Sequence, residues 1–245
     1  SPANAKEWKI DTEVQTNGTV PLSNNPTYPE NGDWLYLIAV APQASSYSED
    51  EGKVTYTLAG QTDLMYASQI SGNRWDGSRF SNTDGTGTPL TYKHLLTQLT
   101  FKAMKKVTGG LSVKVKKITV TTTNSVTLAL TNGETSFSGS GELFLELPDD
   151  GTEISGTTAT PLPGSLLLPP LTGTSDAYKL TVETSIGTFK DLEITPQSAG
   201  GNLSFAGGTS HEITLNIGDK ELGISSVTVS GWVPVIQNDD LNLVE

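Results

Sequence analysis

The stretch YKHLLTQLTFKA, residues 92–103, decides the fold class because a helix and a strand compete for it. Its three leucines are spaced as on one face of a helix. However, Leu99, Phe101 and Ala103 alternate with polar residues, as in a strand that buries one face. We therefore predict a short turn that leads into a strand.

The same alternation of apolar and polar residues recurs on both sides of this stretch. About a dozen short runs show it, and turn-forming residues separate them every 8–12 positions. The clearest runs span residues 53–58, 126–130, 143–147, 178–182, 192–194, 213–217 and 227–229. This pattern predicts an all-β protein.

Local signals refine the prediction. The apolar run 34–40 is typical of a strand covered on both faces, and the polar, proline-containing segment 17–33 of a surface loop. The apolar residues stand at odd positions before Lys116-Lys117 and at even positions after this pair. Such a shift of the alternation by one residue indicates a β-bulge. Asn132-Gly133 favours a hairpin turn. Prolines flank Leu166-Leu167-Leu168, which indicates an edge or crossover strand.

The length of 245 residues suits two β-sandwiches, because each needs about 100 residues. A single closed barrel is the alternative. We place the division between the sandwiches near residues 121–124, because the chain there is least apolar and lysines are frequent. This gives an N-terminal sandwich over 1–123 and a C-terminal sandwich over 124–245.

Composition excludes several functions. The 27 acidic and 15 basic residues give a net charge of −12, which argues against a nucleic-acid partner, because phosphates attract clustered Lys and Arg. The sequence has no cysteine, so thiolate metal sites and cysteine nucleophiles are ruled out.

No catalytic or metal-binding pattern is visible. The two histidines, His94 and His211, lie among strand-like apolar neighbours and have no metal-ligand spacing. Ser210 and His211 are adjacent in a predicted strand, so they point to opposite faces and do not form a nucleophile–base pair. We expect no enzyme activity, cofactor or metal. Trp75 and Trp34 are either loop anchors or platforms for a sugar ring.

Particular motifs point to a family. DLMYA (63–67) is followed, some 25 residues later, by YKHLLTQLTFK (92–102). The C-terminal half contains YKLTV (178–182), FAGGTSHEITL (205–215) and VTVSGW (227–232). Together these motifs resemble the fimbrillin-like family, the subunits of type V pili of Gram-negative gut and oral anaerobes.

The resemblance implies two tandem transthyretin-like Greek-key sandwiches, export as a lipoprotein precursor and a place in the fimbrium at the outer membrane. It also implies adhesion, with host or bacterial surface ligands, and assembly by donor-strand exchange. In that mechanism a protease that cuts after Arg or Lys removes the first strand, and a strand from another pilin subunit fills the groove. The physical basis is β-augmentation, which pairs exposed backbone groups and fills apolar pockets together.

The candidate removable strand contains Trp8, Ile10, Thr12 and Val14, which alternate with polar residues. The segment 17–33 that follows it has no Arg or Lys. Our hypothesis is that this strand is retained, which suits an anchor or tip subunit. The alternative is that the sequence begins after the cut.

The candidate donor strand is the C-terminal tail. Four of its apolar residues stand at odd positions, so they would share one face of a strand: Val233, Val235, Leu241 and Leu243. The alternative is that residues 233–236 complete the second sandwich. We expect a non-enzymatic pilus subunit involved in adhesion. The rival function is a surface carbohydrate-binding module of a polysaccharide-utilisation system.

Overall fold

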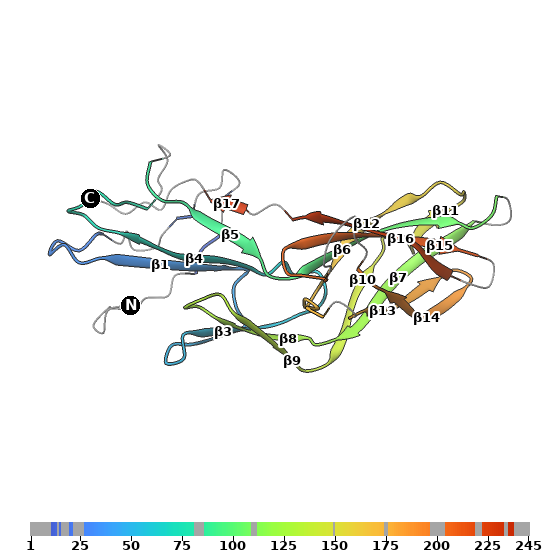
Figure 1. Ribbon diagram of the computed structural model, residues 1–245, viewed down its shortest axis with the longest axis horizontal. Helices are drawn as coiled ribbons and strands as arrows, with labels where there is room; N and C mark the ends of the chain where they lie inside the picture. Colours follow the sequence, from blue (N-terminus) through green and yellow to red (C-terminus); the bar gives the residue numbers. More distant parts are fainter. Residues whose placement is uncertain are drawn as a thin grey trace.

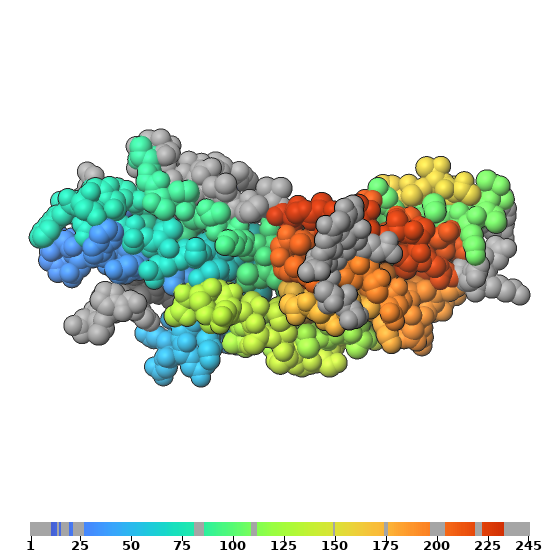
Figure 2. All heavy atoms as spheres, viewed as in Figure 1, coloured from blue at the N-terminus to red at the C-terminus, as the bar shows by residue number. Residues whose placement is uncertain are grey.

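The computed structural model describes residues 11–13, 15, 20–21, 27–80, 86–108, 112–148, 150–173, 176–196, 204–218, 222–232 and the backbone of 235–237. Within these residues the chain forms seventeen strands and no helix, which confirms the predicted all-β fold. The strands form four sheets in a sandwich-like arrangement, two toward each end of an elongated molecule (Figures 1 and 2).

Two four-stranded sheets form the end of the molecule that contains β1. The first has the order β1-β4-β5-β17, with strands β1 (Leu35–Ala41), β4 (Met65–Gly72), β5 (Leu90–His94) and β17 (Val235–Gln237). The second has the order β2-β3-β8-β9, with strands β2 (Ser46–Ser48), β3 (Lys53–Thr57), β8 (Ser125–Ala129) and β9 (Thr135–Ser138). The Tyr66 hydroxyl of β4 donates to the Leu130 carbonyl at 2.9 Å and ties the two sheets together.

Two further sheets form the other end. One has the order β12-β6-β15-β16, with strands β6 (Thr97–Lys105), β12 (Thr160–Leu168), β15 (Thr209–Ile217) and β16 (Leu222–Gly231). The other has the order β10-β7-β13-β14, and β11 also pairs with β7; its strands are β7 (Val113–Thr122), β10 (Gly141–Glu146), β11 (Thr152–Ile154), β13 (Tyr178–Thr184) and β14 (Gly187–Ile194). Strands β6 and β15 are parallel, whereas the other ladders among the described strands are antiparallel.

Strand pairing crosses the division expected at residue 123 in both directions. Strands β6 and β7 precede that point, yet they pair with β12, β15, β13 and β10, which follow it. Strand β8 follows it, yet pairs with β3. A cut between residues 123 and 124 therefore does not separate the sheets, because long-range pairing, which alternation does not specify, decides the grouping of strands.

Several local predictions are confirmed. Residues 95–96 turn between β5 and β6, although 92–94 belong to β5. Lys116 is the extra residue where the β13–β7 register shifts, as expected for a bulge. Asn132-Gly133 connects β8 to β9, with Gly133 at φ 75°. Strand β12 is an edge strand with a register shift between Pro161 and Ser165.

The β1–β4–β5 sheet has apolar residues packed on both faces. Ile38 and Val40 of β1 pack against the larger core, which continues through all four sheets. Leu35 and Leu37 pack against a second cluster on the opposite face. The buried residues of this second cluster are Val20, Tyr28, Ala67, Phe80, Leu90 and Tyr92. The prediction of a surface loop over 17–33 is therefore wrong for Val20 and Tyr28, which are buried against the sheet.

The connection between β3 and β4 packs closely against the sheets of the other end. The Leu167 amide donates to the Gly60 carbonyl at 2.6 Å. Gly60 has φ 98°, and a Cβ there would lie 2.7 Å from Leu166 Cδ1 and 2.9 Å from the Phe144 amide nitrogen. Both the backbone conformation and the close approach require glycine at this position.

Candidate functional site: the strand position beside β5

After β16, which belongs to a sheet at the other end of the molecule, the chain continues to β17, and β17 pairs with β5 (Figure 1). Its three residues pair antiparallel with β5, with Val235 opposite Tyr92 and Gln237 opposite Leu90. The alternative that residues 233–236 complete the second sandwich is wrong for Val235 and Ile236, because the backbone edge of β5 accepts them. Val233, Leu241 and Leu243 lie outside the described residues.

Strand β5 presents a firmly packed surface to β17. Its residues alternate between buried and exposed, and Leu90 and Tyr92 belong to the second apolar cluster. Burial raises the pKa of the Tyr92 phenol, so this group stays neutral at physiological pH. In the same cluster, the Tyr28 hydroxyl accepts the Phe80 amide at 2.9 Å. The second apolar cluster thus holds β5, the strand that pairs with β17, in place.

An aromatic stack marks the point where the chain leaves β16 for β17. The rings of His94, at the end of β5, and Trp232, just after β16, are parallel within 6° with centroids 3.7 Å apart. The Trp232 amide donates to the Gly208 carbonyl at 3.0 Å, and the Gly208 amide donates to the Leu96 carbonyl at 2.9 Å. These contacts hold the start of the tail beside the end of β5.

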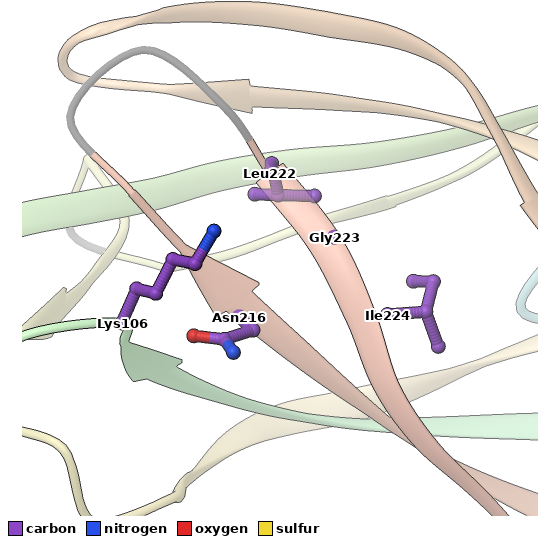
Figure 3. Close-up of a pocket in the computed structure, with 5 residues that line it drawn as sticks. All are labelled: Lys106, Asn216, Leu222, Gly223 and Ile224. Carbon is purple, nitrogen blue, oxygen red and sulfur yellow. The ribbon is translucent and has the colours of Figure 1, made fainter.

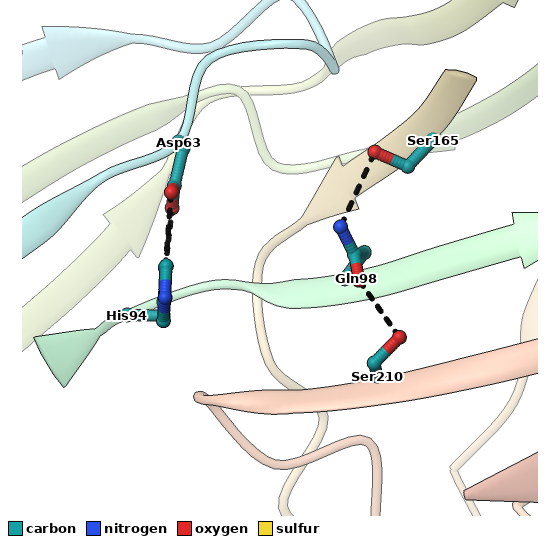
Figure 4. A network of polar contacts seen from close by, with 5 residues as sticks. All are labelled: Asp63, His94, Gln98, Ser165 and Ser210. Atoms are coloured by element: carbon teal, nitrogen blue, oxygen red, sulfur yellow. Dashed lines mark hydrogen bonds and ion pairs between the residues drawn. The ribbon is translucent and has the colours of Figure 1, made fainter. Parts of the chain in front are cut away.

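His94 is also held from the other side. Its Nδ1 lies 2.9 Å from Asp63 Oδ2 and 3.0 Å from Oδ1, as Figure 4 shows. Only 8% of His94 is exposed. Asp63 lies between β3 and β4, so the cluster of Asp63, His94 and Trp232 joins three parts of the chain. Sequence reasoning missed this cluster because its members are far apart in the sequence.

Gln98 of β6 connects the strands on its two sides (Figure 4). Its Nε2 donates to the Ser165 hydroxyl of β12 at 3.4 Å, and its Oε1 accepts from the Ser210 hydroxyl of β15 at 2.7 Å. Ser210 is therefore engaged on the face opposite to His211, as predicted for neighbours in a strand. The pair cannot act as a nucleophile and base.

His211 is a buried residue of β15 with no exposed surface. The Thr209 hydroxyl donates to the Ala206 carbonyl, so it accepts from His211 Nε2 at 2.9 Å. This assigns the proton to Nε2 and leaves Nδ1 as a buried acceptor without a hydrogen-bond partner. Burial lowers the pKa of His211 to about 4, so the ring is neutral at pH 7.

A family model described as fimbrillin-like matches residues 2–232. The chain belongs to the fimbrillin-like family. This confirms the resemblance seen in the sequence motifs. No curated protein matches the chain.

Two solved structures with low sequence identity, from Bacteroides uniformis and Bacteroides ovatus, share the fold of this fimbrillin-like chain. A proposed cell adhesion protein from Bacteroides uniformis has a TM-score of 0.57 and 15% identity, over 84% of this chain and 76% of that one. Another from Bacteroides ovatus has a TM-score of 0.54 and 16% identity, over 87% and 75%. A fimbrial protein from Bacteroides vulgatus has a TM-score of 0.45 and 17% identity, over 80% and 77%.

The described part of the fimbrillin-like chain has little that suggests small-molecule chemistry. A hollow of about 120 Å³ is lined by Lys106, Asn216, Leu222, Gly223 and Ile224 (Figure 3). Typical ligand pockets measure about 300–1,000 Å³. Among the described residues, no group of three or more His, Asp or Glu side chains is placed to hold a metal. That part of the chain also contains no helix long and apolar enough to span a membrane.

Of the four candidate residues of the first strand, the structure describes only Thr12. This residue is exposed and lies outside the strands, and its hydroxyl donates to the Pro21 carbonyl at 2.7 Å. Trp8, Ile10 and Val14 lie outside the described residues. The role of this segment therefore stays a prediction.

Proposed function

We propose that this protein is a structural subunit of a bacterial cell-surface pilus and assembles with other subunits by β-strand complementation. The observation that carries the proposal is the addition of β17 to β5, in a sheet at the opposite end of the molecule from β16. The same edge is a position that a strand from another copy fills with equivalent backbone hydrogen bonds.

The place of β17 at the edge of its sheet favours an exchangeable strand. β17 is paired on one side only, with β5, whereas β15 lies between β6 and β16 and is paired on both sides. A strand that is paired on one side opens at a lower free-energy cost than an internal strand. In our proposal, the tail of one subunit, with Val233, Val235, Leu241 and Leu243 as its donor residues, pairs with β5 of the next.

Membership of the fimbrillin-like family supports a non-enzymatic role at the cell surface in adhesion. We further infer export as a lipoprotein precursor and a location in the fimbrium at the outer membrane, as the family resemblance implies. The absence of Arg and Lys from segment 17–33 favours retention of the first strand and an anchor or tip position. N-terminal sequencing of subunits from native filaments tests this, because a start well after Val14 would rule out retention.

The main experiment removes the tail. A chain truncated after Ile236 is expected to fold, because the core residues described above all precede Ile236, and to lose filament assembly. Electron microscopy and heat-resistant ladders in gel electrophoresis provide the readout, with the full chain as reference. If the truncated chain still assembles, the donor role of Leu241 and Leu243 is lost.

A peptide experiment isolates the receiving edge. A chain that ends at Trp232 exposes the edge of β5, and a synthetic peptide of residues 233–245 is expected to bind it. A peptide of the same length with Val235 and Ile236 both replaced by proline is the matched control, because proline cannot donate to the ladder. Equal binding of the two peptides would contradict strand complementation.

A further inference from the structure

Trp75 is unusual in being both exposed and firmly held. Its side chain is 71% exposed, the largest exposed fraction among the described large apolar residues. It lies in the turn that follows β4, where the Asn73 Oδ1 accepts the amides of Trp75 at 2.7 Å and of Asp76 at 3.2 Å. The Asn73 Nδ2 donates to the Gly32 carbonyl at 2.6 Å. Asn73 is itself buried, so the turn has a fixed base.

The indole ring rests directly on the backbone of Gly32. A Cβ at Gly32 would lie 2.3 Å from Cε3 and 2.6 Å from Cδ2 and Cζ3 of Trp75. Gly32 also has φ 79°, which other residues rarely adopt. The backbone of Gly32 thus supports one part of the ring while most of the side chain stays in solvent.

Arg79 connects the turn to the apolar cluster beneath it. Its guanidinium donates to the carbonyls of Asn73 at 2.5 Å, Ser78 at 3.1 Å and Arg74 at 3.1 Å. The same guanidinium lies 5.1 Å from the centroid of the buried Tyr28 ring. Because the turn is fixed by these contacts, a ligand that binds Trp75 loses little free energy in ordering it.

Exposed polar residues flank Trp75 in its turn, and a second exposed indole lies two residues after Gly32 in the chain. Trp34 is 41% exposed and begins the segment that leads from Gly32 into β1. Asn31 donates to Asp33 Oδ2 at 2.8 Å in the same segment, and Arg74 and Asp76 are exposed in the turn. These two segments lie at the end of the molecule farthest from β7 and β14, where the blue and teal atoms meet in Figure 2.

We propose that Trp75 is a stacking platform for a sugar ring of a neutral glycan. A pyranose has an apolar C–H face, which matches the exposed indole, and a rim of hydroxyls, which match the guanidinium of Arg74 and the carboxylate of Asp76 in the same turn. A nucleic acid does not suit a chain with a net charge of −12. A protein partner requires a contact of about 800 Å² with an apolar centre, whereas the ring stands among charged residues.

This inference goes beyond the pilus role, since it assigns a ligand class to the turn that follows β4. The test applies the full chain to immobilised neutral polysaccharides (mannan, galactan, β-glucan and neutral mucin O-glycans), followed by calorimetry with oligosaccharides of any that binds. Trp75→Ala is expected to weaken binding by about tenfold or more, the loss of one stacked ring. Trp75→Tyr is expected to retain part of the affinity because it keeps an aromatic face.

Ile186→Ala is the matched control, because Ile186 is an exposed apolar residue of the β13–β14 turn at 45% exposure. It should leave glycan binding unchanged, and Trp75→Ala should leave filament assembly and thermal stability unchanged. The proposal is overturned if none of the polysaccharides binds, or if Trp75→Ala binds as tightly as the unmodified chain. Neither outcome affects the strand-complementation proposal, which is read from assembly.

Discussion

The ring of His94 lies parallel to the ring of Trp232 at 3.7 Å, and this stack joins the end of β5 to the residue that follows β16. Trp232 is the last residue with a described side chain before β17. The position of its ring therefore determines where the tail meets β5. In the proposed strand complementation the tail needs a fixed starting point, and the stack provides one.

Replacement of Trp232 by alanine is expected to loosen β17 from β5. The change removes a half-buried aromatic contact and should lower the free energy of unfolding by about 1–3 kcal/mol. Hydrogen exchange of the amides in residues 90–92 of β5, which lie opposite β17, should become faster, because the paired strand detaches more often. Trp232→Phe is the control, since it keeps an aromatic ring on His94. Unchanged exchange in Trp232→Ala would show that the stack does not hold the tail.

The contact between Asp63 and His94 is expected to contribute to stability despite its partial exposure. Asp63 is 31% exposed and His94 Nδ1 lies 2.9 Å from it, so Asp63→Ala leaves a nearly buried ring nitrogen without this partner. We expect a loss of about 0.5–1.5 kcal/mol in urea unfolding. A double-mutant cycle with His94→Gln should give a coupling energy of about 0.5 kcal/mol or more.

The ion pair of Lys53 and Glu51 offers the comparison for this prediction. It joins two exposed side chains at 3.2 Å, so Glu51→Ala should change stability by less than about 0.5 kcal/mol. Equal effects of Asp63→Ala and Glu51→Ala would contradict a special role for the contact with His94.

Buried His211 is expected to make the fold less stable in acid. Burial lowers its folded-state pKa to about 4, below the ordinary 6.5, so the unfolded chain binds a proton first as the pH falls. The contribution of His211 is therefore fully present above pH 6.5 and is lost as the pH falls through that value to about 4. The slope for one proton is at most about 1.4 kcal/mol per pH unit.

His211→Leu removes the titrating group, so its unfolding free energy should depend less steeply on pH between 4 and 6.5 than that of the unmodified chain. Urea unfolding at fixed ionic strength measures both curves, and their difference isolates His211 from the carboxylates that titrate in the same range. Parallel curves would mean that the ring is protonated equally in the folded and unfolded chains.

Sequence patterns predicted features that depend on neighbours in the chain. Alternation located β6, the change of parity located the bulge at Lys116, and the dipeptide Asn132-Gly133 located the β8–β9 hairpin. Each of these features is determined by local backbone preference and by which face of a strand is buried. Such signals do not depend on the identity of the adjacent strand.

The partners of the strands were not predictable in this way. The parallel pairing of β6 with β15 and the antiparallel pairing of β17 with β5 join segments far apart in the sequence, and alternation is satisfied by any apolar neighbour. The candidate site was the least predictable feature, because Asp63, His94 and Trp232 come together only through such pairings. Trp75 was recognised as a candidate from its residue type, whereas its support by Gly32 required the structure.

Gly60 is expected to be among the least replaceable glycines, because it lies where the β3–β4 connection meets β10 and β12. In Gly60→Ala the Cβ would approach Leu166 Cδ1 to 2.7 Å and the Phe144 backbone nitrogen to 2.9 Å, at φ 98°. Gly52→Ala is the matched control, since Gly52 has φ 58° and no atom within 4 Å of the new Cβ. The control isolates the cost of positive φ, about 1–2 kcal/mol.

Gly60→Ala should therefore lower the free energy of unfolding by about 3 kcal/mol or more, because steric overlap with the Phe144 backbone adds to the cost of positive φ. Urea unfolding measures both variants under the same conditions. Similar losses in the two variants would mean that the β3–β4 connection moves away from β10 and β12 without cost. A larger loss at Gly60 would show that this contact stabilises the junction between the two ends of the molecule.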